Sequence, residues 1–152
     1  IAVVFNTIQK DTYKDAEVAG VVEDANIPEP THDPEFDYIE PAGRSVPKDK
    51  IIYDSMRKFA KYEDDINGIQ IIVSQQPMPD TFKTDPEAGV KKVAGDFGAK
   101  EPLSSDGLNM YYGQNAKGPQ TLIFTKNGLL VFIVTASEVE KNSLMVYAGN
   151  LK

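Results

Sequence analysis

The sequence predicts an α+β fold: an antiparallel β-sheet built from hairpins, with one mid-chain helix and one C-terminal helix packed on it. Asn-Gly occurs twice between runs of strand-forming residues, at Asn67-Gly68 and Asn127-Gly128. This dipeptide favours the two-residue turn of an antiparallel hairpin. Residue patterns that begin helices occur at Thr84 and at Ser137, and each comes after a predicted strand. The order of strands, helix, strands and helix is typical of this class.

The chain has the length of a single domain. It has 152 residues, of which 41% are hydrophobic and 26% charged, as is usual for globular proteins. We divide it into a partly helical N-terminal segment (1–26), an acidic, proline-rich arm (27–50) and an α+β core (51–152). Nine acidic residues, and no lysine or arginine, lie from Asp15 to Glu40. Because prolines are dense there as well, we expect a solvated, mostly extended arm.

The core is expected to begin with three strands. Ile51–Tyr53 resembles a short strand, although the apolar residues that follow also have helical spacing: Ile52, Met56, Phe59 and Tyr62. Lys58–Ile66 and Ile69–Gln75 are expected to pair as a hairpin around Asn67-Gly68. Pro77 ends the second of these strands, because proline has no backbone N–H to donate.

A capped helix and three more strands follow. Thr84-Asp85-Pro86-Glu87 reads as a capping box, which predicts a helix as far as Gly98. Its buried face is expected to hold Val90, Val93, Ala94 and Phe97. The strands are Leu108–Tyr112, Gln120–Lys126 and Leu129–Ala136. The last of them is apolar on both faces, so we expect it at the centre of the sheet or covered on both sides.

A second capping box, Ser137-Glu138-Val139-Glu140, is expected to open the C-terminal helix. The residues of this helix that are expected to face inward are Leu144, Tyr147, Ala148 and Leu151.

Composition excludes several classes of function. The chain has no cysteine, so disulfides, thiol catalysis and cysteine-ligated zinc are excluded. Its single histidine, His32, rules out sites with several histidine ligands. The net charge of -7 disfavours nucleic-acid binding, and no segment has the roughly 20 apolar residues that a membrane-spanning helix needs. Calcium could gather carboxylates of the acidic arm, but these have no fixed ligand spacing.

Two glycine-containing segments match ligand-binding loops in part. Glu63–Gly68 has the acids and the sixth-position glycine of a calcium loop, but Ser74 stands where a glutamate is required. Gly113–Gly118 has the glycine spacing of a phosphate loop, but Pro119 follows in place of lysine. We therefore interpret them as a hairpin turn and a strand connection. The sequence predicts no cofactor, no metal site and no catalytic residue.

Four residues are candidates for ligand binding: Tyr111, Tyr112, Gln75 and Gln76. Tyr111 and Tyr112 are adjacent in a strand and point to opposite faces, so we expect one in the core and the other exposed. An exposed tyrosine ring with a polar hydroxyl suits a binding surface. Gln75 and Gln76 end a strand, where their amides either bind a ligand or cap the sheet edge.

The core resembles a known group of domains. The segments that carry the resemblance are Tyr62–Gln76, Ile72–Pro79, Thr84–Gly98, Gln120–Ala136 and Ser137–Leu151, the last ending in Ala148-Gly149-Asn150-Leu151. Together they resemble PsbP-like domains and small extracytoplasmic domains of bacterial membrane-anchored proteins. The resemblance does not include residues 1–50. It implies an accessory or binding domain outside the cytoplasm, and it transfers no catalytic residue.

We therefore expect a non-enzymatic extracytoplasmic domain that binds a partner protein or a small ligand. A membrane tether is expected upstream of Ile1, because Ile1–Phe5 is a short apolar run; an ordinary amphipathic helix explains this run equally well. One alternative is a carboxylate-dependent hydrolase acting on glycans, which requires two facing acids in a pocket. Another is a self-assembly element, in which Ile1–Ala19 packs on a neighbouring subunit.

Overall fold

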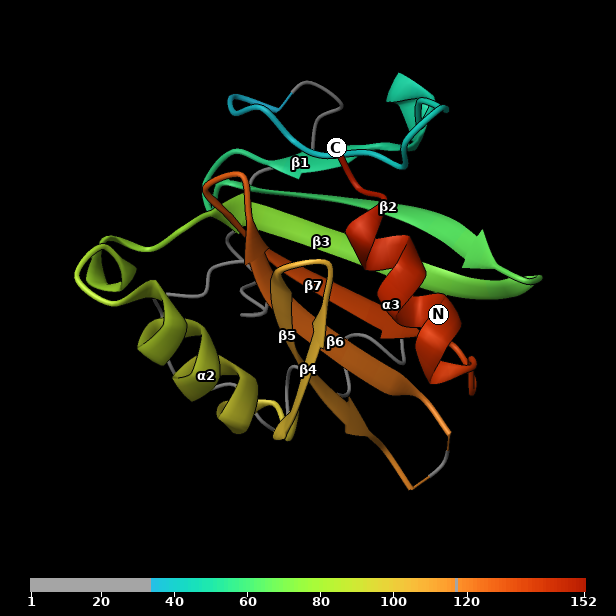
Figure 1. Cartoon of the computed structure of the whole chain (residues 1–152). Helices are drawn as coiled ribbons and strands as arrows, with labels where there is room; N and C mark the ends of the chain where they lie inside the picture. Colours follow the sequence, from blue (N-terminus) through green and yellow to red (C-terminus); the bar gives the residue numbers. More distant parts are fainter. Residues whose placement is uncertain (1–33, 117) are drawn as a thin grey trace.

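The computed structural model describes residues 34–116 and 118–152 (Figure 1). These residues form a seven-stranded antiparallel sheet with the strand order β1-β2-β3-β7-β6-β5-β4, and the predicted α+β class is confirmed. The strands are β1 (Ile52–Asp54), β2 (Phe59–Ile66), β3 (Ile69–Pro77), β4 (Glu101–Ser105), β5 (Leu108–Gln114), β6 (Gln120–Lys126) and β7 (Leu129–Thr135). The helices are η2 (Lys48–Lys50), η3 (Asp80–Phe82), α2 (Pro86–Asp96) and α3 (Lys141–Gly149).

The sheet separates two hydrophobic cores. All seven residues of β7 are buried, as the sequence predicts for a strand that is apolar on both faces. Leu130 and Phe132 pack with the apolar residues of α2 on one face. Val131 and Ile133 belong to the core on the other face, which contains Leu144 of α3. Side chains alternate along a strand, so β7 contributes to both cores.

Helix α2 begins one residue later than its sequence signal suggests. Asp85 is the cap, because its side chain accepts a hydrogen bond from the backbone N–H of Ala88 at 3.1 Å. The predicted box between Thr84 and Glu87 therefore does not form, since Ala88 occupies the third helical position. The predicted C-terminal stop is confirmed, because Gly98 has a φ of 75°.

Helix α3 also begins later than predicted. Its first residue is Lys141, and the cap residue Glu140 makes no side-chain hydrogen bond to the helix. Leu151 is buried as predicted but lies beyond the helix, where it forms an isolated antiparallel bridge with Pro41.

At the edges of the sheet, one further prediction is corrected and one unpredicted strand is found. The helical interpretation after Ile52 is wrong, because β1 ends in a turn in which Lys58 has a φ of 55°. Strand β4 was not predicted from the sequence. It pairs with β5 across Asp106 and Gly107, whose φ values of 51° and 81° match those of Asn-Gly turns.

A close backbone approach joins α2 to the sheet. A Cβ atom on Gly113 of β5 would lie 2.5 Å from the carbonyl oxygen of Gly98 and 2.9 Å from the Cα atom of Ala99. Both neighbours lie in the short segment after α2, beyond its C-cap residue Phe97. The absence of a side chain at position 113 therefore lets the end of α2 lie against β5.

The proline-rich arm packs against the core where the structure describes it. Ile39 and Val46 are 3% and 6% exposed and belong to the same core as α3. The backbone of Glu40 exchanges two hydrogen bonds with that of Lys152, at 2.8 and 2.7 Å. A wholly solvated arm is therefore wrong for residues 34–50.

Several predictions concern residues 1–33, which lie outside the described residues. They are the apolar run Ile1–Phe5, the N-terminal helix of Ile1–Ala19 and the surroundings of His32. Within the described residues, no helix is long and apolar enough to span a membrane.

Candidate functional site

The two glutamine candidates are buried. Gln75 is 1% exposed, and its amide pairs with the backbone of Ile39: Oε1 accepts from the N–H at 2.7 Å and Nε2 donates to the carbonyl at 2.9 Å. Gln76 is 5% exposed on the opposite face of β3. Gln75 thus fastens the proline-rich arm to the sheet, and neither amide is presented on the surface.

The two tyrosine candidates point to opposite faces of β5, but the expectation that one is exposed is wrong. Tyr111 and Tyr112 are 8% and 6% exposed, because each face of the sheet carries a hydrophobic core. The hydroxyl of Tyr111 donates to Glu87 at 2.7 Å, and this bond together with burial raises the pKa of Tyr111 to about 12. Tyr112 lines a polar cleft described below.

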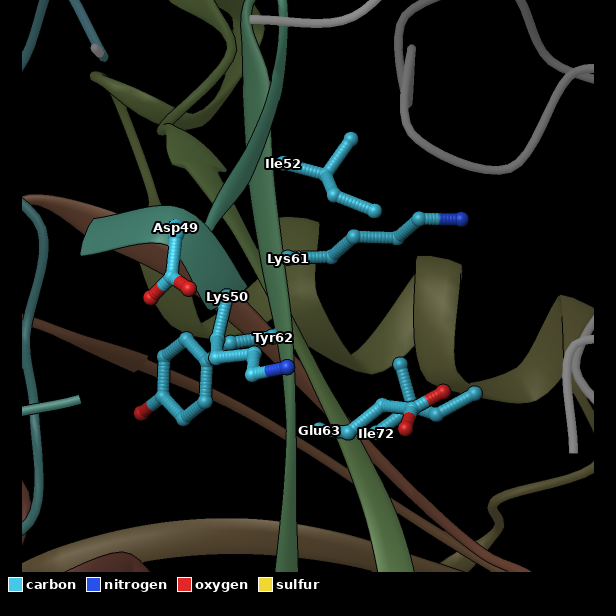
Figure 2. A pocket seen from close by; sticks show the side chains of 7 residues that line it. All are labelled: Asp49, Lys50, Ile52, Lys61, Tyr62, Glu63 and Ile72. Atoms are coloured by element: carbon cyan, nitrogen blue, oxygen red, sulfur yellow. The ribbon is translucent and has the colours of Figure 1, made fainter. Parts of the chain in front are cut away.

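The first concave site, which we call the edge groove, lies at the outer edge of β2. It has a volume of about 560 Å³ and is lined by Asp49, Lys50, Ile52, Lys61, Tyr62, Glu63 and Ile72. Figure 2 shows Ile52 and Lys61 extending to one side of β2, whereas the Asp49 carboxylate and the Tyr62 ring lie on the other. The groove therefore wraps around the edge of the strand.

The geometry of the edge groove follows from the length of β1. The pairing of β1 with β2 ends at Ile52 and Lys61. Beyond Lys61, no strand in the described part of the chain pairs with the outer edge of β2, which continues to Ile66. The site thus combines a strand edge with apolar side chains and charges of both signs. Burial, aided by the nearby Arg57, lowers the pKa of Lys61, while Glu63 acts in the opposite direction.

The second concave site, which we call the glutamate cleft, lies between β4, β5 and the start of α3. It also has a volume of about 560 Å³, and its lining is mainly polar: Glu101, Tyr112, Gly113, Gln114, Gln120, Glu138, Val139, Glu140 and Lys141. The ammonium of Lys141 lies 2.8 Å from a carboxylate oxygen of Glu101 and 4.6 Å from the centroid of the Tyr112 ring. The hydrogen bond to Glu101 raises the pKa of Lys141.

Gln120 holds the glutamate cleft in shape. It is 2% exposed, and its Oε1 accepts from the backbone N–H of Val139 at 2.7 Å. Its Nε2 donates to the carbonyl of Val139 and to the hydroxyl of Tyr112, both at 2.8 Å. One buried amide thus fixes both the segment before α3 and the Tyr112 hydroxyl.

A separate polar network joins β2, α3 and the arm. The side chain of Asp64 is 6% exposed, and its Oδ2 accepts from the Arg44 guanidinium and from the Tyr147 hydroxyl, each at 2.6 Å. Burial by itself would raise the pKa of Asp64, but hydrogen bonds from Arg44, Tyr147 and the N–H of Asp65 hold it below its ordinary value. Burial raises the pKa of Tyr62 and Tyr147, so both phenols stay protonated at neutral pH. This network holds the arm and α3 against β2, so we assign it a structural role.

The structure offers no metal centre in its described part. No group of three or more histidine, aspartate or glutamate side chains there could hold a metal ion. The acids of Glu63–Gly68 lie on β2 and its turn into β3, and Gly68 has a φ of 82°. The hairpin-turn interpretation therefore fits this segment.

Sequence reasoning missed the residues that build the two concave sites. The edge groove depends on where β1 stops, and the glutamate cleft brings together residues from β4, β5, β6 and α3. The local signal for the glutamate cleft is the pair of acids in Ser137–Glu140, which also fits the pattern of a capping box. No family model, curated protein or solved structure matches this chain.

Proposed function

We propose that the chain is a non-enzymatic binding domain that takes a partner protein or a small ligand in the edge groove. One observation carries the proposal: the groove joins an edge of β2 with no strand partner in the described chain to apolar side chains and to charges of both signs. Its volume lies within the usual range of ligand sites, and a strand edge can add an extended peptide through main-chain hydrogen bonds.

The cellular setting is part of the same proposal. We propose that the domain acts outside the cytoplasm and is tethered to a membrane. Support comes from the resemblance of the core to PsbP-like and other extracytoplasmic domains. Separating the cells that make the full-length protein into cytoplasmic, membrane and extracytoplasmic fractions tests this setting, and recovery in the cytoplasmic fraction alone would contradict it.

Binding in the edge groove can be tested by nuclear magnetic resonance. The full chain is labelled with 15N and titrated with a fragment library of small amphipathic molecules, and separately with short extended peptides. We expect the amide shifts that move to cluster around the groove, including Ile52 and Glu63. Ile52→Ser is expected to abolish binding, because Ile52 supplies apolar surface and is 36% exposed.

The control is an equivalent loss of apolar surface elsewhere. Val146 of α3 is 52% exposed and does not line the groove, so Val146→Ser should bind the same fragments as the unaltered chain. Fragments that bind nowhere on the protein, or bind equally well to Ile52→Ser, would show that the groove is not the site.

The hydrolase alternative has one observation in its favour: the glutamate cleft gathers three carboxylates. None of the three side chains is buried, however, and a general acid of this class depends on burial to stay protonated near neutral pH. Release of reducing sugar from a panel of glycans would test it, with Glu138→Gln as the inactive variant. The self-assembly alternative concerns Ile1–Ala19, and sedimentation of the full chain over a range of concentrations tests it.

A further inference from the structure

The two Asn-Gly turns of the sheet have nearly the same backbone. Asn67 and Gly68 join β2 to β3 with φ values of 52° and 82°, and Asn127 and Gly128 join β6 to β7 with 53° and 76°. All four residues are exposed. An isoleucine follows the first dipeptide and a leucine follows the second, so the local sequences are similar as well. A difference in reactivity between the two turns must therefore come from their surroundings.

An Asn-Gly dipeptide contains both partners of a covalent reaction. The backbone nitrogen of the glycine attacks the side-chain amide carbon of the asparagine, which forms a C–N bond and closes a succinimide ring. The bond from that carbon to the side-chain nitrogen then breaks, and ammonia leaves with the proton that the glycine nitrogen gives up. Water opens the ring at one of its two carbonyls and yields aspartate or isoaspartate. Glycine favours the first step, because no side chain shields its nitrogen.

The first turn places a carboxylate on the attacking group. Asp65 Oδ2 accepts a hydrogen bond from the backbone N–H of Gly68 at 3.3 Å, and the side-chain nitrogen of Asn67 donates to Ser143 Oγ at 3.5 Å. Among the described residues, no side chain accepts from the corresponding N–H of Gly128. A general base must lie within hydrogen-bond reach of the proton that it removes. Asp65 thus occupies the position of a base at the first turn, and the second turn has no equivalent in the described chain.

We propose that Asn67 is a site of spontaneous deamidation that Asp65 assists. The Asp65 carboxylate takes the proton from the Gly68 nitrogen as this nitrogen attacks the amide carbon of Asn67, and it returns the proton to the departing ammonia. The product adds a negative charge to a turn that already contains Asp65, and it loses the amide that contacts Ser143 of α3. This reaction is independent of ligand binding in the edge groove.

The experiment compares both asparagines in the same molecules. The full chain is incubated at neutral pH and then digested with trypsin, which cleaves after Lys61 and Lys126 and so places the two asparagines on separate peptides. Tandem mass spectrometry gives the deamidated fraction of each. In the folded protein, we expect Asn67 to react roughly tenfold faster than Asn127, which is less than the about 100-fold of an active-site base because Asp65 is exposed. In concentrated urea, which abolishes the fold, the two rates should become similar.

A variant separates base catalysis from a structural role of the same hydrogen bond. Asp65→Ala removes the base and should lower the rate at Asn67 to about that at Asn127. A bond that only stiffens the turn predicts the opposite, because its loss would loosen the turn and raise the rate. The rate at Asn127 should not change in this variant, and this shows that the fold is retained.

The control removes the same charge elsewhere. Asp96 is exposed at the end of α2, so Asp96→Ala should leave the rates at both asparagines unchanged. Three results would overturn the proposal: equal rates at Asn67 and Asn127 in the folded protein, an advantage of Asn67 that persists in urea, or an unchanged or higher rate at Asn67 in Asp65→Ala.

Discussion

Replacing Gln120 by alanine is expected to destabilise the protein strongly. Its amide makes two hydrogen bonds to Val139, one to Tyr112 and one from the Thr135 hydroxyl at 3.3 Å, all of them buried. Each of these four hydrogen bonds contributes a net of about 0.5–1.5 kcal/mol. Because the site can relax in part, we expect the free energy of unfolding to fall by about 3 kcal/mol. The backbone N–H and carbonyl of Val139 would lose these partners.

Urea denaturation measures this loss. With an m value of about 1.5 kcal/mol/M, a loss near 3 kcal/mol lowers the midpoint by about 2 M. Gln114 is the matched control: it is the same residue type, lies directly opposite on β5 and is exposed. Gln114→Ala should change the free energy of unfolding by less than about 0.5 kcal/mol. Equal costs for the two alanine variants would refute the role that we assign to Gln120.

Gly113→Ala should lower the free energy of unfolding by about 1–3 kcal/mol, because its Cβ would lie 2.5 Å from the carbonyl oxygen of Gly98. Gly95→Ala is the control: its Cβ would meet nothing within 4 Å, so this variant should be as stable as the unaltered chain or more stable. Thermal unfolding measures both. Asp64 has a lowered pKa in the folded state, so its stabilisation is complete above the ordinary carboxyl pKa and is lost as the pH falls through the folded value. Asp64→Asn should therefore cost about 1–3 kcal/mol at pH 7 through the weakened bond to Arg44, and the difference from the unaltered chain should shrink in acid. Urea midpoints measured across this pH range would contradict the assignment if the difference stayed constant.

The strand content was largely predictable from local sequence, and the exceptions have physical reasons. β7 is apolar on both faces and was correctly expected to be covered on both sides. β4 was missed because Glu101–Ser105 is a mainly polar edge strand with an exposed pattern and a proline. The Asp106-Gly107 dipeptide marks its turn, because Asp-Gly favours the same two-residue hairpin turn as Asn-Gly.

The candidate sites were much less predictable, because they depend on contacts between distant residues. The position of Gln75 at the end of a strand suggests an amide that is free to bind a ligand. In the structure, this amide makes two hydrogen bonds with the backbone of Ile39 in the arm. Tyr111 and Tyr112 were assigned to opposite faces correctly, but a single sequence does not show that both faces are covered. Gln120 carries no local signal of its role, since its partner Val139 lies beyond the whole of β7.

The strand order has a consequence for how the chain folds. Every pairing in the described sheet joins neighbours in sequence except the one between β3 and β7. The chain can therefore form a three-stranded and a four-stranded meander locally, and it must then join them through one slow, long-range ladder. The outer strands of the complete sheet, β1 and β4, have three and five residues. The two strands that form the long-range pairing, β3 and β7, have nine and seven. Before the two meanders join, β3 and β7 are therefore edge strands, and they are longer and more apolar than the outer strands of the complete sheet. Pairing between chains through these edges competes with folding most strongly at this stage.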